Sequence, residues 1–439
     1  MPRLSPASVL ALVGLFGCGA PPAAQPVSAA PVEAAIALVR FPLPSPMPAR
    51  YLRTLAYDPG GYDAASPPGG PTRTGVSDLL LGDLLYHAPT TLGPRARSVG
   101  ISCQTCHPNG ATNTNFFLDG LSDKRGEIDV STHFFRRGAD DGRANPVDIP
   151  SLRGARFTGP YGHDGRTASL AEFTHDVVTS EFGGEPLGPR ELAALVRYVQ
   201  DLDFLPNRNL DVRSNLTSRA TDAARRGEAI FLRPMPGFGG ASCASCHPSS
   251  KFFRDGQVHR LGTEVSPSPY AVDGGYETPT LLGTTETAPY FHDGRFATLA
   301  EVVAWFDTSF RLELSAAERD DLTAYVETVG AVDEPFDDRP FARRLDQTFA
   351  YVALLEDENP SIRRAALDAV MFELSGAPPE ISARVAQMRA RLAEVRVRAS
   401  TAALDTKECR ALRAELTRLA ADWGGTVTGS QPVQDTEPR

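Results

Sequence analysis

Apolar residues recur at intervals of three and four positions along much of this chain. That spacing is typical of helices that bury one face, and many of these stretches begin at Ser, Thr or Pro, as helices commonly do. The stretches are residues 77–87, 169–178, 189–202, 221–232, 298–306, 315–329, 361–374, 381–397 and 406–423. We therefore expect an all-α protein.

Comparing the chain with itself reveals an internal repeat. The sequence ISCQTCHP at 101–108 matches ASCASCHP at 241–248. Further on, IPSLRG and GPYGHDGR in the first copy match TPTLLG and APYFHDGR in the second, in the same order and at similar spacing. A repeat of this kind indicates two copies of one structural unit. We expect tandem domains at 72–208 and 217–334, followed by a helical region at 340–425.

The N-terminus has the pattern of an export signal. Arg3 precedes an apolar run from Val9 to Phe16, which is far shorter than the roughly 20 residues of a membrane-spanning helix. Residues 1–18 are therefore expected to be a signal peptide. The small residue before Cys18 favours the lipoprotein type, which leaves a lipidated cysteine; an ordinary secretory signal is the alternative. The Pro- and Ala-rich start of 19–71 predicts a tether, and the whole pattern predicts a periplasmic protein.

The overall charge restricts the partners that we expect. The chain has 44 basic and 54 acidic residues, for a formal charge of −10. Nucleic acids and anionic membrane surfaces select basic faces, so we exclude both as general partners, apart from a lipid anchor. A small redox protein that donates electrons would bind this chain through its own basic patch.

Each matched octapeptide contains a Cys-x-x-Cys-His run. The two runs are Cys103, Cys106 and His107, and Cys243, Cys246 and His247. This spacing puts two thiols one helical turn apart, where they can add to both vinyl groups of a haem while the histidine ligates its iron. A zinc site would need further ligands at short spacing, and a thioredoxin-like pair would need an adjoining βαβ pattern. We therefore predict two covalently bound haem c groups.

The segments between each haem motif and the following His-Asp-Gly-Arg are rich in turn residues and lack periodicity. Structureless loops of that length are uncommon unless something fills their centre, and a haem would do so. The predicted fold is thus all-α, with two tandem cytochrome c-like haem domains, long irregular loops and a C-terminal helical segment. In that segment, Met388, Leu392 and Val395 are predicted core residues, and Cys409 a buried one without a disulfide.

The second ligand of each iron determines what a haem can do. An iron with two protein ligands transfers electrons, whereas one with an open position binds peroxide or oxygen. No methionine lies between Met235 and Met371, so the second haem needs another ligand or stays open. The candidates are His87, His133, His163 and His175 for the first haem, and His259, His292, Tyr270, Tyr276 and Tyr290 for the second.

Each His-Asp-Gly-Arg unit ends in an arginine, Arg166 or Arg295, that has two interpretations. The guanidinium suits a haem propionate, since its planar fork matches a carboxylate. Alternatively, Asp-Gly forms a tight turn before the next helix and the arginine is exposed. Both copies keep the whole unit beside a haem motif, which favours the propionate interpretation.

Together these residues resemble the bacterial di-haem cytochrome c peroxidases and the related di-haem enzyme of methylamine utilisation. The resemblance covers residues 75–332 and rests on the paired haem motifs, GEAIF at 227–231, TPTL at 278–281 and TAPYFHDGR at 287–295. It implies two α-helical cytochrome c domains, one haem that stores an electron, another that reduces hydrogen peroxide, and a calcium ion between the domains. By position, Thr287 and Pro289 correspond to the residues whose carbonyls hold that calcium.

Two positions depart from the family pattern. The place of the storage-haem methionine falls on Phe306, and the place of a tryptophan beside Asp-Gly-Arg falls on His163. The missing methionine favours an open iron and hence a peroxidase-type oxidoreductase. The missing tryptophan and the many histidines favour a non-catalytic electron carrier with two six-coordinate irons. A haem-bearing sensor whose C-terminal helices bind a partner is a third alternative, and no catalytic residue is assigned.

Overall fold

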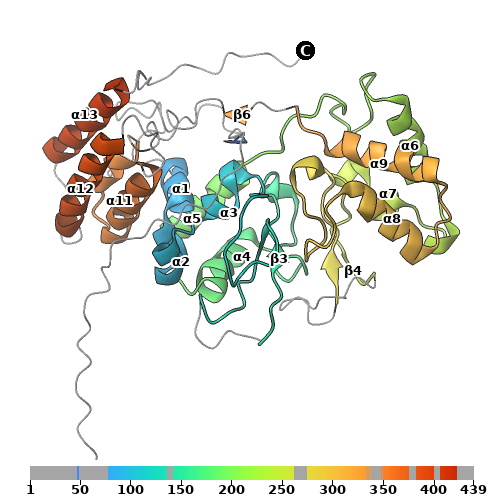
Figure 1. The fold of residues 1–439 in the computed structure, drawn as a ribbon, viewed down its shortest axis with the longest axis horizontal. Helices are drawn as coiled ribbons and strands as arrows, with labels where there is room; N and C mark the ends of the chain where they lie inside the picture. Colours follow the sequence, from blue (N-terminus) through green and yellow to red (C-terminus); the bar gives the residue numbers. More distant parts are fainter. Residues whose placement is uncertain are drawn as a thin grey trace, which may run out of the picture. The chain divides into compact units, whose positions relative to one another are not determined.

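The computed structural model describes residues 47–48, 78–135, 142–261, 274–333, 336–337, 348, 350–374, 382–399 and 406–422. The predicted signal peptide, Cys18, Tyr270 and nearly all of the predicted tether lie outside this part of the chain. The described part is mostly helical, as predicted (Figure 1). None of its helices is both long and apolar enough to cross a membrane.

The first half of the repeat, residues 78–208, holds the first set of elements. They are α1 (Asp78–His87), α2 (Pro94–Val99), α3 (Cys103–Cys106), β2 (Glu127–Ile128), β3 (Val147–Asp148), α4 (Leu170–Asp176) and α5 (Pro189–Asp201). The second half, residues 217–333, gives the same order without a counterpart of α2. Its elements are α6 (Asp222–Leu232), α7 (Cys243–Cys246), β4 (Val258–His259), β5 (Tyr276–Glu277), α8 (Leu299–Phe310) and α9 (Ala316–Gly330).

The strands are short antiparallel pairs that an all-α prediction omits. Glu127 pairs with Asp148 in the first half, and Val258 pairs with Glu277 in the second. A third pair joins β1 (Met47–Pro48) to β6 (Phe336–Asp337). Pairs of two residues give almost no sequence signal, because a period of two needs a longer run to be visible.

Both halves use one glycine to pack their first and last helices. A β-carbon on Gly82 of α1 would lie 2.1 Å from the carbonyl oxygen of Ala194 in α5. A β-carbon on Gly227 of α6 would lie 1.9 Å from the carbonyl oxygen of Asp321 in α9. Only glycine allows the two backbones to approach this closely. The repeat therefore conserves the helix pair that brackets each Cys-x-x-Cys-His turn.

The C-terminal helices share a core with the first half. They are α11 (Pro360–Leu374), α12 (Ser382–Ala399) and α13 (Thr406–Asp422). Helix α11 packs against α1, and the predicted core residues Met388, Leu392 and Val395 are buried, as is Cys409. Arg97 of α2 donates to both carboxylate oxygens of Asp368 at 2.9 and 3.1 Å.

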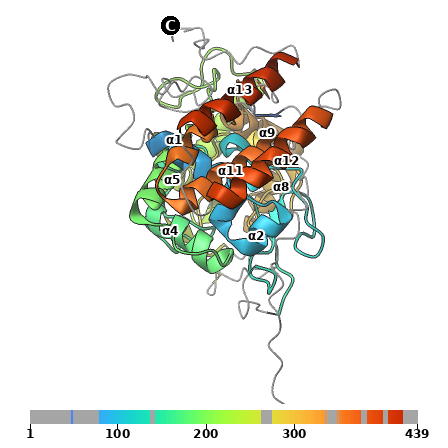
Figure 2. The same cartoon turned by 90° about the vertical axis from the view of Figure 1, so that its left-hand side faces the viewer.

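Figure 2 shows α11 lying across the front of the elements of the first half. Every predicted helix is present, and α1 is buried on nearly all sides because α5 and α11 cover it.

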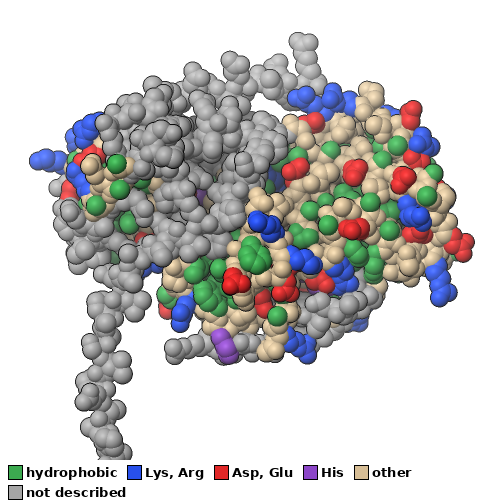
Figure 3. All heavy atoms as spheres, viewed as in Figure 1, with side chains coloured by type: hydrophobic (Ala, Val, Ile, Leu, Met, Phe, Trp, Pro, Cys, Tyr) green, Lys and Arg blue, Asp and Glu red, His purple; other side chains and the backbone are tan. Residues whose placement is uncertain are grey.

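Charged side chains of both signs are interspersed on the face that Figure 3 shows over α8 and α9. The described part of this face therefore shows neither sign of charge in excess.

Candidate functional site

The two Cys-x-x-Cys runs fold into matching single turns. In α3 the backbone N–H of Ser102 donates to Thr105 Oγ1 at 3.0 Å, and in α7 that of Ser242 donates to Ser245 Oγ at 3.0 Å. These capping contacts close the start of each turn. In both turns the N–H of the following histidine donates to the carbonyl of the first cysteine, at 2.8 and 2.9 Å. Each turn thus places two thiols and an imidazole together.

The chemistry of these side chains fits covalent haem. The four cysteines of the turns form no disulfide, and burial raises the pKa of Cys103 to about 12 and of Cys243 to about 11, so the thiols are protonated. Burial lowers the pKa of His107 to about 4 and also lowers that of His247, which keeps both imidazoles neutral. Nδ1 of His247 lies 2.8 Å from the carbonyl oxygen of Phe253, which leaves Nε2 available to a metal.

The predicted distal histidines of the first half have different surroundings. Nε2 of His163 lies 3.0 Å from the carbonyl oxygen of Asp148, and burial lowers the pKa of His163. His133 is exposed, and His87 at the end of α1 is buried with Nδ1 3.0 Å from Oδ1 of Asp83. Asp83 raises the pKa of His87 against the opposing effect of burial. Ligation by any of these histidines stays a prediction.

In the second half, one candidate histidine lies close to the Cys-x-x-Cys-His turn. Ligand atoms of Cys246, Asp255 and His259 all lie within 4.8 Å of one another, and Nε2 of His259 is 2.7 Å from Oδ2 of Asp255. Because Cys246 is expected to carry a thioether, we assign this group to the edge of the second haem site. The other candidate, His292, stacks on Tyr276.

Arg166 joins two carboxylates in the first half. It contacts Asp164 Oδ1 at 3.0 Å and Glu181 Oε1 at 2.6 Å. Glu181 ends a π-helical turn, Val177–Glu181, that follows α4, and such turns often occur at functional sites. Burial raises the pKa of Glu181 to about 7, although Arg166 acts in the opposite direction. Near neutral pH this carboxyl can therefore give or take a proton.

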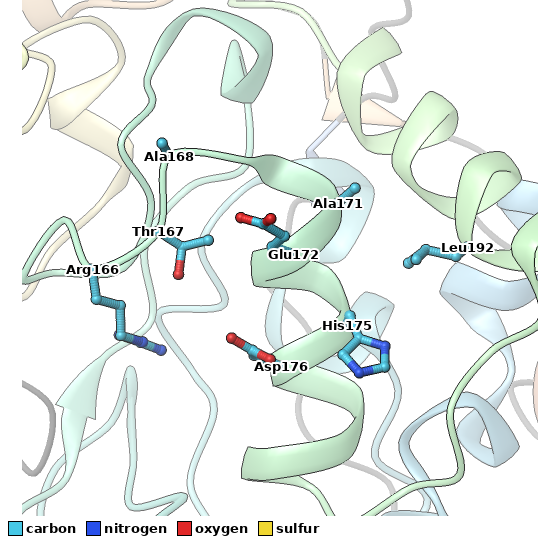
Figure 4. Close-up of a pocket in the computed structure, with 8 residues that line it drawn as sticks. All are labelled: Arg166, Thr167, Ala168, Ala171, Glu172, His175, Asp176 and Leu192. Carbon is cyan, nitrogen blue, oxygen red and sulfur yellow. The ribbon is translucent and has the colours of Figure 1, made fainter.

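A shallow pocket of about 460 Å³ opens beside Arg166. Figure 4 shows Glu172 and Asp176 on the side of α4 toward Arg166, and the imidazole of His175 between α4 and Leu192 of α5. Two lining residues, Ala171 and Leu192, pack against the same core cluster as Cys103. The pocket is thus a polar opening beside the core that carries the first haem motif.

The corresponding region of the second half is filled by aromatic rings. Phe306 stacks on Phe310 at 5.8 Å between ring centroids, and Trp305 meets Phe306 edge-on at 5.0 Å. Phe291 lies 5.1 Å from Trp305, and Phe238 lies 4.7 Å from Phe310. Helix α8 runs through to Phe310 without a π-helical turn. This apolar cluster leaves little place for polar chemistry.

The two arginines of the His-Asp-Gly-Arg units both contact carboxylates of the chain. Arg295 donates to both oxygens of Asp293, with its shortest contact at 2.6 Å, and Arg166 contacts Asp164 and Glu181 as described. Neither contact tests the propionate interpretation, which stays a prediction. The Asp-Gly turn is present in both copies, because Gly165 and Gly294 have positive φ angles.

Two buried carboxylate oxygens near Pro289 accept no hydrogen bond. They are Oε1 of Glu127 and Oδ1 of Asp148, the paired residues of β2 and β3. A β-carbon on Gly294 would lie 2.4 Å from Oε1 of Glu127 and 2.7 Å from the Pro289 ring. Burial, and then Glu127, raise the pKa of Asp148 well above its usual value. Lys124 lies 3.5 Å from Oε1 of Glu127, and its backbone N–H donates to Oε2 at 3.2 Å. Two buried carboxylates side by side with this single lysine fit a divalent cation.

Sequence reasoning missed Glu181, Glu127 and Asp148. None of them belongs to a motif, and each gains its character from burial and from a neighbour distant in sequence. Glu181 could have been found from its place after the first His-Asp-Gly-Arg, where the second copy has Phe310. A charged residue in one copy of a repeat, at a position that is apolar in the other copy, can thus indicate a functional residue.

The sequence of these turns, Cys-x-x-Cys-His, is the attachment motif of haem c, which is typical of c-type cytochromes. No protein-family model matches the chain. Two curated proteins are related to it in sequence. The gamma subunit of hydrazine synthase from Kuenenia stuttgartiensis is 28% identical over 242 residues, 46% of this chain and 63% of the relative. The methylamine utilization protein MauG from Methylorubrum extorquens is 30% identical over 173 residues, 34% of this chain and 47% of the relative.

The match to MauG confirms the predicted resemblance to the di-haem enzyme of methylamine utilisation. The chain covers less than two thirds of either relative. Among solved structures, hydrazine synthase of Kuenenia stuttgartiensis gives a TM-score of 0.42 at 20% identity, covering 73% of this chain and all of that one. A MauG-like protein associated with microbial copper homeostasis gives 0.41 at 17% identity, covering 66% and 94%. Both TM-scores are low, so the functional argument rests on the site and the sequence matches.

Proposed function

We propose that this chain is a periplasmic di-haem c-type cytochrome that reduces hydrogen peroxide at its first haem and receives electrons through its second. The observation that carries the proposal is the contrast between the halves: the first has a half-buried carboxyl, Glu181, held by Arg166 at 2.6 Å with a pKa raised to about 7, and the second has an aromatic cluster. Bound haem supplies an iron that can bind peroxide and exchange electrons. The relatives named above are consistent with redox chemistry.

Reduction of peroxide to two waters consumes two electrons and two protons. Glu181 has the proton affinity that this step needs, since a general acid–base works best with a pKa near the operating pH. Arg166 fixes the half-buried Glu181 carboxylate through the 2.6 Å contact. These residues would therefore move protons while the second half serves electron transfer.

We propose that a calcium ion binds between the halves through Glu127 and Asp148, with the carbonyl oxygens of Thr287 and Pro289. Within the described residues, no backbone N–H donates to either carbonyl oxygen. Hard cations such as Ca²⁺ prefer carboxylate and carbonyl oxygens. The ion would neutralise the two buried carboxylates.

Export and partners are proposed from the sequence alone. The predicted signal peptide and Cys18 support a periplasmic protein anchored by lipid, and haem c is attached outside the cytoplasm. The acidic net charge supports a small basic redox protein as electron donor.

The spectra of the purified holoprotein test the proposed function. We expect electron paramagnetic resonance and visible spectra of the oxidised and half-reduced protein to show a high-spin ferric haem that shifts when hydrogen peroxide is added. Two low-spin haems that are inert to peroxide in both states would instead identify a non-catalytic electron carrier.

A further inference from the structure

Three consecutive residues after the second Cys-x-x-Cys-His turn connect that turn to the first half of the chain. The ring of Phe252 stacks on the ring of Phe157 in the first half, with centroids 4.3 Å apart and planes inclined by 20°. The carbonyl oxygen of Phe253 lies 2.8 Å from Nδ1 of His247. Arg254 then donates to backbone carbonyls of the first half. These three residues therefore contact both the predicted proximal histidine and the other half.

Arg254 is a buried residue, 4% exposed, whose hydrogen bonds reach both halves. Its Nη1 donates to the carbonyl oxygens of Phe157 and Gly159 in the first half, at 3.3 and 2.7 Å. Its Nη2 donates to Glu277 Oε2 at 2.7 Å, and its Nε donates to the carbonyl oxygen of Thr278 at 3.4 Å, both in the second half. A planar guanidinium has five N–H donors in fixed directions and can hold all four acceptors, whereas an ammonium has three donors.

The backbone of Phe252 and Phe253 needs surrounding contacts to keep its conformation. Both residues have positive φ angles, 58° and 55°. Residues with a β-carbon avoid this region, and bulky ones stay there only where the rest of the structure holds them. The Phe252 carbonyl accepts from Thr280 Oγ1 at 2.6 Å, and Phe253 is buried. The carbonyl that faces His247 is thus held from both sides, and the contacts made by its neighbours Phe252 and Arg254 extend to the first half.

The first copy of the repeat has different residues at these positions. When the two Cys-x-x-Cys-His turns are aligned, positions 252–254 correspond to Thr112, Asn113 and Thr114. Asn113 bonds within its own half, because its Nδ2 donates to the carbonyl oxygen of Thr105 at 2.8 Å. The aromatic stack and the arginine that join one half to the other thus belong to the second copy.

We propose that Arg254 is a positioning residue, which anchors this segment to the first half and so fixes the Phe253 carbonyl against His247. The inference deepens the proposed function, because it rests on a haem at the second turn that receives electrons. A carbonyl that accepts the Nδ1–H of an iron-bound histidine makes the imidazole more basic, and a more basic imidazole stabilises ferric over ferrous iron. Contact between the halves thus sets the midpoint potential of the second haem.

Spectroelectrochemical titration of the full-length holoprotein tests this role. Arg254→Lys keeps the positive charge but cannot hold all four acceptors, so the Phe253 carbonyl should move away from His247. We expect the equilibrium constant for reduction of the second haem to rise about tenfold, which raises its midpoint potential by about 59 mV for one electron. The two potentials are assigned with the variant that lacks the first haem, Cys103→Ala with Cys106→Ala.

Two further variants show where the effect originates. Phe157→Leu changes the first half without changing any charge, and it removes the stack on Phe252. It should raise the potential of the second haem in the same direction by a smaller amount. The matched control is Arg226→Lys, because Arg226 also forms two bonds, both at 2.7 Å to Asp321, but these stay within the second half. It should leave both potentials unchanged.

The outcomes separate this role from the proposed function. If Arg254→Lys and Phe157→Leu both leave the potential of the second haem unchanged while two haems stay bound, the positioning role is overturned. A rise in Arg254→Lys alone overturns it too, since Arg254 would then act within the second half. Should Arg254→Lys lose the second haem, the result for Phe157→Leu decides. The titration needs no peroxide, so a first haem that is inert to peroxide would refute peroxide reduction without changing the expected shift.

Discussion

The two halves of this chain share a scaffold but differ where chemistry would occur. When the copies are aligned on His-Asp-Gly-Arg, Glu181 of the first half corresponds to Phe310 of the second, and Asp176 corresponds to Trp305. The first half breaks its helix with a π-helical turn and directs Glu181 to Arg166. The second half continues the helix and packs aromatic rings. The two copies share the Cys-x-x-Cys-His turns but differ in the polarity of the segment that follows His-Asp-Gly-Arg.

This difference supports the separate tasks that we propose for the two halves. A polar group with a pKa near 7 suits a step that moves protons, whereas an apolar surround disfavours charge and suits electron transfer without proton transfer. The glycines at the helix crossings, Gly82 and Gly227, serve the same packing in both copies. The shared residues thus account for the common scaffold, and the residues that differ account for the proposed difference in function.

The largest expected effect comes from removing one haem at a time. Replacing both cysteines of the first turn, Cys103→Ala with Cys106→Ala, should leave one covalent haem and abolish the peroxide-sensitive signal. The same change at Cys243 and Cys246 should also leave one haem but keep the peroxide-sensitive signal, because the polar site is intact. Intact-protein mass spectrometry counts the haems, and a variant that still carries two would refute the assignment of the turns.

A smaller effect is expected at the acid–base residue itself. Glu181→Gln should slow the reaction with peroxide by about 10²- to 10⁴-fold while both haems remain bound. If the ionised carboxylate first takes a proton from hydrogen peroxide and then gives it to the departing oxygen, the wild-type rate should rise as pH increases through about 7, and the variant should lose this rise. Stopped-flow absorbance at a series of pH values measures both the rate of the reaction with peroxide and its pH dependence.

The matched control for Glu181 is Glu185→Gln, since Glu185 is exposed and lies four positions further along. It should leave the rate and its pH dependence unchanged. An unchanged rate in Glu181→Gln would show that Glu181 takes no part in the reaction with peroxide. That result would favour the electron-carrier alternative.

The sequence predicts the scaffold better than the site. Helices such as α6 and α9 have long apolar periodicities and clear starts at Thr221 and Ser315, so their positions could be predicted within a few residues. The two Cys-x-x-Cys-His turns are local motifs, so their chemistry can be predicted from consecutive residues. Glu181, Glu127 and Arg254 depend instead on contacts between distant segments and on burial, which neither motif spacing nor composition reveals.

The smallest effect is expected at the arginines of the two His-Asp-Gly-Arg units. If Arg295 contacts a propionate of the second haem, Arg295→Gln removes a positive charge and favours the ferric state. The loss of one nearby charge should destabilise the ferrous state by on the order of 1 kcal/mol. The midpoint potential of that haem should then fall by about 40 mV, since the couple transfers one electron.

Arg166→Gln sharpens the comparison, because Arg166 also holds Glu181 while Arg295 contacts Asp293. Its loss should lower the potential of the first haem and also shift the pH dependence of the peroxide reaction upward, since an opposite charge near Glu181 is removed. Spectroelectrochemical titration of both variants measures the potentials. Two unchanged potentials would show that the arginines serve only the Asp-Gly turns, and the halves would then differ in Glu181 and the aromatic cluster alone.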